Sequence, residues 1–511
     1  MGSLNETNPS LWVETTRDES TSFPRLAGTV DVDVAVIGAG MAGLLTATLL
    51  KEAGATVAVV EAGRICSGVS GYTTAKVTSL HGLAYAGLAS NRSEDVARAY
   101  GEANQAGLGL IARLVAERSI ECDFSRRAAY TYTADSEQLS SVQEEAEVAA
   151  RLGLPATFTT ETELPFPVLG AVRFDNQAQF HPRRFCLALA QGLGEHVYEQ
   201  SRVRDVDAES DVSSVLTEDG TVRARHVVVA THLPFLDRGM FFAKCHPTRS
   251  YALAVEVDGE GPTGMYISAE SPTRSLRAAE SDRYLIVGGE GHKVGQSDDT
   301  RVHYRNLEDW AAEHFPGRPV VHRWSAQDHV PVDGTPFVGP LLPGSNILVA
   351  TGFKKWGMTN SAAAALLLAD HIAGRDNPWA EAFDATRQGS AITSSELWKE
   401  NANAGKHLVG DRLAAIRAED ADTLAPGEGG IVELDGERVA AFRDDNGTLH
   451  AVSSVCKHIG CIVAFNTAER TWDCPCHGSR YGIDGRVIEG PAVADLDPVS
   501  ASGPQITPQG A

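Results

Sequence analysis

Two short segments late in the chain each combine a cysteine with a histidine. Cys456 precedes His458 by two positions, and Cys474 precedes His477 by three. Thiolate and imidazole groups are ligands for zinc and for iron–sulfur centres. Zinc fingers place like ligands together and then a helix, whereas each segment here pairs unlike ligands among glycines and predicted strands. The spacing therefore favours an iron–sulfur centre held by two loops, with zinc as the alternative.

The C-x-H and C-x-x-H spacing is typical of Rieske [2Fe–2S] domains. This resemblance implies that Cys456 and Cys474 bind one iron, while His458 and His477 bind the other. Replacing two thiolates by neutral imidazoles raises the reduction potential of such a cluster to about −150 to +300 mV. We therefore predict a Rieske-type cluster with these ligands.

The resemblance extends to the high-potential Rieske proteins of respiratory cytochrome complexes. It implies a disulfide between Cys461 and Cys476 and a proline loop at Gly490–Pro491 that shields the cluster. It also implies that Ser479 and Tyr481 donate hydrogen bonds to cluster sulfurs and raise the potential.

A glycine-rich turn near the start of the chain lies between a predicted strand and a predicted helix. In a dinucleotide-binding βαβ unit, such glycines permit a tight turn, a close approach to pyrophosphate and helix–strand packing, and an acidic residue accepts from a ribose hydroxyl. The elements are, in order, strand Val32–Ile37, turn glycines Gly38, Gly40 and Gly43, helix Leu44–Ala53, strand Thr56–Val60 and Glu61. We expect the helix N-terminus to face the phosphates.

Two later segments favour FAD over NAD. Strands are predicted at Arg225–Thr231 and Asn346–Gly352, and a helix at Asn360–Ile372. From Asp31 to Ile372 the chain resembles the D-amino-acid-oxidase-like flavoproteins, which include the sarcosine, glycine and glutamylputrescine oxidases. The resemblance implies that the turn before this helix closes over the flavin ring, lined by Gly352, Gly357, Met358 and Thr359.

A loop rich in glycine, serine and threonine follows Glu61, where family members wrap the flavin. Its candidate contacts to phosphate, ribitol or flavin ring are Arg64, Ser67, Thr73, Thr74 and Lys76. The alternative for each residue is an ordinary polar surface position.

The chain departs from the family at two points. The stretch Trp324–Pro331 has no cysteine for covalent attachment, which predicts dissociable FAD. A basic residue that holds a substrate carboxylate in some members is replaced by Thr359. This replacement favours an amine without a carboxylate, unless a cation such as Arg249 supplies the anchor.

Amine oxidation by hydride transfer to flavin N5 requires that the ammonium first lose its proton, to a base or in a desolvated pocket. The candidate catalytic groups near the flavin are Lys76, His81 and Lys355. A structural role is the alternative for His81 and Lys355.

The expected fold is an α/β FAD-binding domain of Rossmann type with an interleaved α+β substrate domain, followed by a small all-β Rieske domain. Strands at Gly430–Leu434, Arg438–Phe442 and Leu449–Val452, with a turn at Asp445–Gly447, indicate the last domain. The expected ranges are 1–82, 182–243 and 323–375 for FAD binding, 83–181 and 244–322 for substrate, 376–425 for a connector with helices at Ser394–Asn401 and Gly410–Glu419, and 426–511 for the Rieske domain.

The composition of this chain of 511 residues disfavours some classes of binding partner. A formal net charge of −23 disfavours nucleic acid and anionic membranes. No apolar run reaches the roughly 18 residues of a membrane helix, and a polar start argues against a secretory signal, so we expect a cytoplasmic protein without membrane insertion. The scattered Cys66, Cys122, Cys186 and Cys245 are expected to be buried.

A two-electron flavin fused to a one-electron cluster favours a dehydrogenase. We expect it to oxidise the C–N bond of a small amine or amino acid and to pass electrons through the cluster to an external acceptor. One alternative is an oxygen-using oxidase with a structural or regulatory cluster. The other is an electron-transfer module that feeds another enzyme, which the single dinucleotide motif disfavours.

Overall fold

The computed structural model describes residues 8–19, 22–208, 211–387, 401–402 and 419–499. The chain divides into two compact units. The first comprises residues 1–292 and 302–398, and the second comprises residues 293–301 and 399–511. The expected connector helix Gly410–Glu419 lies outside the described residues except for Glu419, which begins a strand, and Ser394–Asn401 lies outside them except for the helical Asn401.

The first unit contains an eight-stranded sheet with a parallel centre, in the order β16-β17-β10-β1-β2-β7. Parallel strands buried on both faces read as continuous apolar runs, and Val34–Ile37 at the end of β1 is such a run. The antiparallel β8 and β9 extend from β10. The strands are β1 (Gly28–Ile37), β2 (Val57–Val60), β7 (Val197–Tyr198), β8 (Asp205–Asp207), β9 (Ser213–Leu216), β10 (Gly220–Val229), β16 (Phe337–Pro340) and β17 (Ile347–Thr351).

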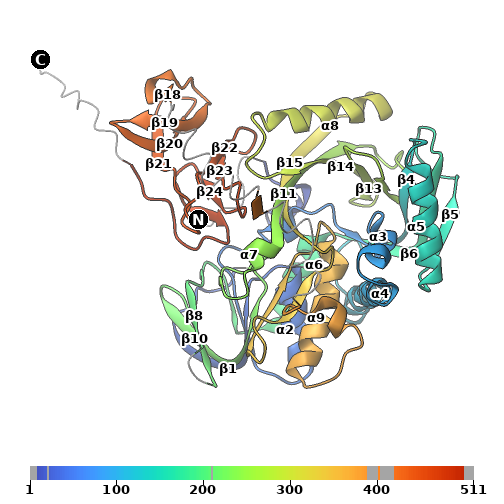
Figure 1. Cartoon of the computed structure of the whole chain (residues 1–511), viewed down its shortest axis with the longest axis horizontal. Coiled ribbons are helices and arrows are strands. Elements are labelled where there is room, and N and C mark those ends of the chain that lie inside the picture. Colours follow the sequence, from blue (N-terminus) through green and yellow to red (C-terminus); the bar gives the residue numbers. More distant parts are fainter. Residues whose placement is uncertain (1–7, 20–21, 209–210, 388–400, 403–418, 500–511) are drawn as a thin grey trace, which may run out of the picture. The chain divides into compact units, whose positions relative to one another are not determined.

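A second, nine-stranded sheet of mixed direction follows the order β15-β11-β14-β13-β12-β4-β6-β3, with β5 beside β6 (Figure 1). β3 and residues 323–331 of β15 come from ranges predicted for FAD binding. These two strands join the second sheet by pairing with β6 and β11. The strands are β3 (Lys76–Val77), β4 (Ser125–Thr133), β5 (Ala156–Thr159), β6 (Gly170–Gln179), β11 (Cys245–Glu256), β12 (Met265–Ser268), β13 (Arg274–Ala279), β14 (Tyr284–Lys293) and β15 (Val320–Pro331).

Helix α9 is the centre of helix packing in the first unit. It contacts α2 and α4, and α2 also contacts α6. Ala362–Ala365 of α9 is fully buried, and a Cβ added to Gly107 of α4 would lie 2.6 Å from the Thr359 carbonyl oxygen. Small residues thus let these helices approach closely. The helices are α1 (Leu11–Thr15), α2 (Met41–Glu52), α3 (Ala84–Asn91), α4 (Glu94–Glu117), α5 (Leu139–Arg151), α6 (Pro182–Leu193), α7 (Phe241–Lys244), α8 (Arg301–His314), α9 (Gly357–Ile372) and α10 (Ala380–Phe383), with a 3-10 turn at Val69–Gly71.

The second unit is built from two four-stranded sheets, in the orders β18-β19-β20-β21 and β22-β23-β24-β25. All pairs are antiparallel except the parallel pair β18–β19. The strands are β18 (Glu419–Asp420), β19 (Gly429–Leu434), β20 (Glu437–Arg443), β21 (Leu449–Ser453), β22 (Ala464–Asn466), β23 (Thr471–Asp473), β24 (Arg480–Gly482) and β25 (Val487–Glu489), with a 3-10 turn at Ala421–Thr423.

Residues 293–301, which lie in the sequence between β14 and α8, belong to this second unit. Thr300 Oγ1 donates a hydrogen bond to Asn466 Oδ1 at 2.8 Å and accepts one from the Ala468 N–H at 2.9 Å. A Cβ added to Gly295 would lie 2.9 Å from Pro475 Cβ. This segment therefore forms part of the packing around the second Cys/His loop.

The predicted fold class is confirmed. Helix α9 begins at Gly357, three residues before the predicted start, because the turn after β17 leads directly into it. The cysteines at positions 66, 122, 186 and 245 are buried, as expected. Among the described residues, no helix is long and apolar enough to cross a membrane.

Candidate functional sites

At two positions of the glycine turn between β1 and α2, there is no room for a side chain larger than hydrogen. Gly38 has φ of +102°, and a Cβ there would lie 2.6 Å from the Ala230 carbonyl oxygen. A Cβ on Gly43 would lie 1.9 Å from the Gly38 carbonyl oxygen. Gly38 and Gly43 thus bring β1, β10 and α2 together, as the dinucleotide-binding pattern predicts.

Gly40 is the N-cap of α2 and has no side chain with which to cap the helix. The Met41 N–H donates to Ser70 Oγ at 3.1 Å, and that oxygen lies 3.0 Å from the position of a Cβ on Gly40. The helix N-terminus is therefore approached by a hydroxyl from the loop after β2, in a setting suited to a phosphate group. The sequence interpretation had not selected Ser70.

Glu61 follows β2 and turns its carboxylate back to the glycine turn. Its oxygens accept hydrogen bonds from the Ala39 N–H at 2.8 Å and the Gly63 N–H at 2.7 Å. Burial raises the pKa of this carboxyl group. Each carboxylate oxygen has more than one acceptor direction, so the placement is compatible with the predicted contact to ribose.

The polar loop after Glu61 has local and long-range contacts. Ser67 Oγ accepts from the Arg64 N–H at 3.2 Å, and Thr73 Oγ1 accepts from the Ala75 N–H at 3.0 Å. Thr74 approaches β14, because a Cβ on Gly288 would lie 3.3 Å from its Cγ2. Arg64 and Ser67 thus shape the start of the loop, while Thr74 reaches the second sheet.

Lys76 is a buried cation in β3. Its ammonium donates a hydrogen bond to Ser275 Oγ on β13. Burial, with a contribution from Arg277, lowers the pKa of Lys76 to about 7. A substantial fraction of this amine is therefore neutral near neutral pH and has a lone pair with which to accept a proton.

His81 ties the chain after β3 to the turn before α9. Its Nε2 lies 2.7 Å from the Thr78 carbonyl oxygen, so Nε2 carries the proton, and its Nδ1 lies 2.5 Å from the Tyr100 hydroxyl. The ring stacks on Trp356 with centroids 4.7 Å apart. Burial lowers the pKa of His81 to about 3. Because both ring nitrogens have partners, this arrangement favours a structural role.

The turn between β17 and α9 contains the residues predicted to line the flavin. Gly352 has φ of +78°, and Gly357 begins the helix. Met358 and Thr359 are buried, and Thr359 Oγ1 donates to the Thr78 carbonyl oxygen at 2.8 Å. The proton of the Thr359 hydroxyl is thus engaged in a hydrogen bond to the protein backbone.

Lys355 in the same turn points toward β14. Its side chain is exposed, and a Cβ on Gly291 would lie 2.6 Å from Lys355 Nζ and 3.6 Å from Ser250 Oγ. The ammonium and hydroxyl groups therefore border the same space beside Gly291. Arg249, the alternative anchor, is buried, and its guanidinium donates to Ser325 Oγ at 3.0 Å and Gln327 Oε1 at 3.2 Å.

One thiol lies beside the closing turn, although the stretch Trp324–Pro331 has none. A Cβ on Gly352 would lie 3.3 Å from Cys245 Sγ, which belongs to the strand paired with β15. Burial raises the pKa of Cys245 to about 12. This thiol is therefore protonated and a poor nucleophile, and dissociable FAD stays a prediction.

The two Cys/His segments of the second unit form facing loops. The rings of His458 and His477 have centroids 5.0 Å apart and stand at 90°. Cys456 and Cys474 are buried, and a hydrogen bond from Cys474 is the main cause that lowers the pKa of Cys456. Two thiols and two imidazoles thus converge, and this donor set fits the predicted [2Fe–2S] cluster.

Cys461 and Cys476 form a disulfide between the two loops, as the Rieske resemblance implied. Cys461, Cys474 and Cys476 also lie close enough together to suggest a metal site. Sulfurs already joined to each other are not thiolates, so Cys461 and Cys476 tie the loops and do not compete as ligands.

Two further residues border the ligand sulfurs. The Tyr481 hydroxyl lies 3.2 Å from Cys456 Sγ and accepts from the Lys457 N–H at 3.1 Å. Ser479 is fully buried, and its Oγ accepts from the Ala492 N–H at 3.1 Å, just after the Gly490–Pro491 loop. Tyr481 therefore lies beside a ligand sulfur, and the hydrogen bonds from both residues to cluster sulfurs stay a prediction.

Comparison with known proteins identifies the family to which this chain belongs. A model of the DAO family, FAD dependent oxidoreductase, matches residues 33–371, and a Rieske [2Fe-2S] domain model matches residues 394–500. The chain therefore belongs to the FAD dependent oxidoreductases of the DAO family and carries a C-terminal Rieske domain. Its cofactors are FAD and a [2Fe–2S] cluster, as predicted.

Individual relatives are similar to the FAD-binding part, to the Rieske part or to both. The putative Rieske 2Fe-2S iron-sulfur protein YhfW of Bacillus subtilis is 36% identical over 96% of this chain and 97% of its own length. Glycine oxidase from Geobacillus kaustophilus shares the fold with a TM-score of 0.60 at 20% identity, over 70% of this chain and all of its own. The cytochrome b6-f complex iron-sulfur subunit 1 of Nicotiana tabacum is 40% identical over 16% of this chain and 37% of its own length.

Proposed function

We propose that the protein is a dehydrogenase that oxidises the C–N bond of a small amine or amino acid and passes the electrons, by way of its own cluster, to an external acceptor. When bound, FAD accepts two electrons as a hydride, and the cluster carries one electron at a time. The observation that supports this proposal most directly is the complete Cys/His ligand set on the same chain as a DAO-family FAD domain.

The proposed base is Lys76. It lies next to the loop assigned to the flavin, is buried, and has a pKa lowered to about 7 by its burial. A substrate ammonium that enters beside it would lose a proton to the Lys76 amine, which frees the nitrogen lone pair that oxidation requires. The Ser275 hydroxyl holds the amine in place.

The proposed anchor for an amino-acid carboxylate is Lys355. Its ammonium and the Ser250 hydroxyl border the space beside Gly291, 2.6 Å and 3.6 Å from the position that a Cβ on Gly291 would take. An exposed cation and a hydroxyl are suitable donors for a carboxylate. The loss of a basic residue at Thr359 therefore does not remove the means to bind an amino acid, and Lys355 takes preference over the buried Arg249.

The proposed acceptor is a one-electron carrier, and the proposed setting is the cytoplasm. The disulfide Cys461–Cys476 is compatible with a reducing compartment because both cysteines are buried. The strongly acidic chain disfavours nucleic acid as a partner.

The test is anaerobic mixing of purified protein with primary, secondary and N-methyl amines and with amino acids. Flavin absorbance and the EPR signal of the cluster are followed in the same samples. Bleaching of the flavin followed by an EPR signal of reduced cluster supports the dehydrogenase and identifies the substrate class. Bleaching without cluster reduction, with peroxide formed on admission of air, would establish an oxidase instead. Reduction by NAD(P)H but by none of the amines would favour an electron-transfer module.

A further inference from the structure

We infer that helix α1 and two other buried segments hold the flavin-binding loop in its binding conformation before FAD arrives. This inference rests on the proposed assignment of the loop after β2 to the flavin. Ser10 and Trp12, which the sequence did not indicate as site residues, are on this inference positioning residues for FAD.

Backbone carbonyls along this loop each accept a hydrogen bond from a distant side chain. Ser10 Oγ donates to the Gly71 oxygen at 2.5 Å, and Trp12 Nε1 donates to the Thr73 oxygen at 2.7 Å. The intervening and following carbonyls have donors from the second sheet. These are Trp324 Nε1 to the Tyr72 oxygen at 2.9 Å and Arg277 Nη1 to the Ala75 oxygen at 3.0 Å.

The donors are all inaccessible to solvent. Ser10, Trp12, Arg277 and Trp324 are each 0% exposed. The bonds to Gly71, Tyr72 and Ala75 are buried, and the bond to Thr73 is partly buried. A carbonyl shielded in this way replaces a lost donor with water less readily than an exposed one, so these bonds restrict the loop more than exposed bonds would. The Arg277 guanidinium also lies 5.0 Å from the Trp12 ring centroid, which couples α1 to the second sheet.

The backbone of the loop is strained at both ends. Cys66 has φ of +56° and Ala75 has φ of +58°, in the left-handed region that non-glycine residues rarely adopt. Such conformations persist where the surrounding contacts over-determine them. At the Ala75 end, the donors from α1, β13 and β15 supply such contacts, because they bond to the carbonyls of Ala75 and of residues 71–73. At the other end, the Cys66 N–H donates to the Ala39 oxygen at 3.1 Å.

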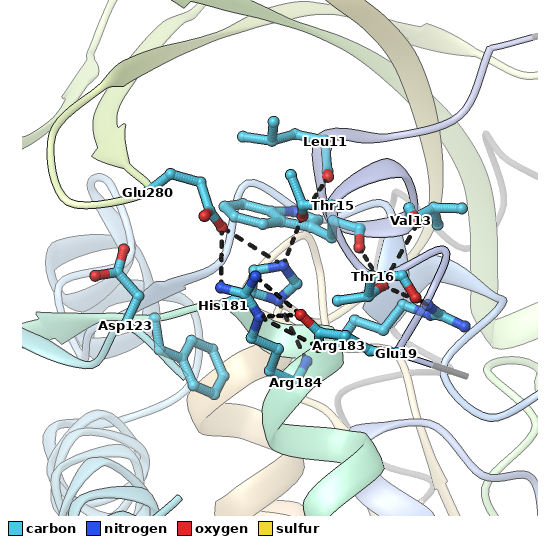
Figure 2. Close-up of polar contacts among 12 residues, drawn as sticks. Leu11, Val13, Thr15, Thr16, Glu19, Asp123, His181, Arg183, Arg184 and Glu280 are labelled. Atoms are coloured by element: carbon cyan, nitrogen blue, oxygen red, sulfur yellow. Dashed lines mark hydrogen bonds and ion pairs between the residues drawn. The ribbon is translucent and has the colours of Figure 1, made fainter. Parts of the chain in front are cut away.

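Helix α1 is itself anchored, on the N-terminus of α6 (Figure 2). Thr15 Oγ1 lies 3.0 Å from His181 Nε2, Thr16 Oγ1 accepts a hydrogen bond from Arg183, and Glu19 accepts one from Arg184 Nε at 3.1 Å. Thr15 is therefore partly buried against the N-cap residue of α6. These contacts hold Ser10 and Trp12 at fixed positions relative to the loop.

His181 completes this anchor in a single protonation state. Its Nδ1 accepts from the Arg184 N–H at 3.2 Å, so the proton lies on Nε2. Thr15 Oγ1 donates to the Leu11 oxygen at 2.8 Å and therefore accepts from His181. Burial lowers the pKa of His181 to about 2, which keeps this neutral form throughout the range where the protein would be assayed.

The test measures FAD affinity of the apoprotein in three variants of the full chain. Trp12→Phe removes the donor to Thr73 but keeps an aromatic ring, and Ser10→Ala removes the donor to Gly71. Trp379→Phe is the matched control, since its indole N–H donates to Glu102 at a surface site. Readouts are the FAD dissociation constant by titration, the fine structure of the visible flavin band and the melting temperature of each apoprotein.

We expect Trp12→Phe and Ser10→Ala each to raise the FAD dissociation constant by about tenfold, the equivalent of one buried hydrogen bond, and to blur the flavin band. Trp379→Phe should leave both unchanged. Unchanged FAD affinity in Ser10→Ala and Trp12→Phe, with a fall in melting temperature alone, would overturn the inference while leaving the flavoenzyme intact. Failure of the unaltered protein to bind FAD would instead refute the loop assignment and the proposed function together.

Discussion

Tyr481 lies 3.2 Å from the sulfur of Cys456 through its hydroxyl oxygen. The same oxygen accepts the Lys457 N–H at 3.1 Å, which leaves the hydroxyl proton free to point at the sulfur. A hydrogen bond to a ligand sulfur stabilises the more negative, reduced state of a cluster. The relationship is therefore expected to raise the reduction potential of the cluster.

Replacement of Tyr481 by phenylalanine should lower that potential. The loss of one hydrogen bond of about 1 kcal/mol corresponds to a decrease on the order of 40 mV for a one-electron couple. Redox titration followed by EPR measures the change. An unchanged or higher potential in Tyr481→Phe would show that the hydroxyl proton points elsewhere.

Replacement of Lys76 by methionine should slow anaerobic flavin bleaching by substrate. Because the neutral amine is the proposed base and its pKa is about 7, the bleaching rate of the unaltered protein should rise as the pH increases through 7. Loss of a general base costs typically 10²- to 10⁴-fold in rate, so we expect about a hundredfold decrease or more and loss of this pH dependence. Lys51→Met, at an exposed lysine that caps α6, is the control. A pH profile that survives in Lys76→Met would assign the base to another group.

Replacement of Lys355 by methionine should separate carboxylate binding from chemistry. For an amino-acid substrate we expect KM to rise about tenfold with kcat little changed, since the variant loses a charge-assisted hydrogen bond. For an amine without a carboxylate, both constants should stay close to those of the unaltered enzyme. Equal effects on the two substrate classes would contradict the anchoring role.

Replacement of Glu145 by glutamine should change the pH dependence of stability. Glu145 is buried and accepts from the Tyr85 N–H at 2.8 Å and the Ala86 N–H at 2.7 Å at the start of α3, and burial raises its pKa to about 7. The folded state therefore binds more protons than the unfolded state between pH 4.5 and 7, so this group contributes its full stability below pH 4.5 and loses it as the pH rises through 7.

The glutamine side chain does not ionise. The unfolding free energy of Glu145→Gln minus that of the unaltered protein should therefore increase between pH 5 and pH 8. This difference should increase by an amount on the order of 3 kcal/mol if unfolding is two-state. Denaturant melts at both pH values measure it. A constant difference between the two proteins would mean that Glu145 ionises at its ordinary pKa.

Local spacing alone singles out the proposed cluster ligands and the glycine turn. Cys456 and His458 lie on one loop, and Gly38 and Gly43 lie within one turn, so sequence separation alone brings their chemistry together. The donors that hold the flavin loop could not be found in this way. Trp12 and Thr73 are 61 positions apart, and Trp324 and Tyr72 are 252 apart, and these bonds exist only because α1 and β15 pack beside the loop.

The interpretation of the closing turn shows the same limit. The sequence placed His81 near the flavin as a possible base, but not the Tyr100 hydroxyl that occupies its Nδ1. Likewise, Thr359 was selected as a flavin neighbour, while its bond to the Thr78 oxygen depends on tertiary packing. Residue type and spacing select candidate side chains for the site. The hydrogen-bond partners decided which of them remained available for chemistry.

Because residues 293–301 belong to the second unit, that unit is not one continuous stretch of the chain. A fragment that begins at residue 399 lacks Thr300, whose hydroxyl meets Asn466, and Gly295, which packs on Pro475 between two cysteines. The iron–sulfur part is therefore made of two separate stretches of the chain. A transplant of this part onto another flavoprotein would have to carry residues 293–301 as well as the C-terminal stretch.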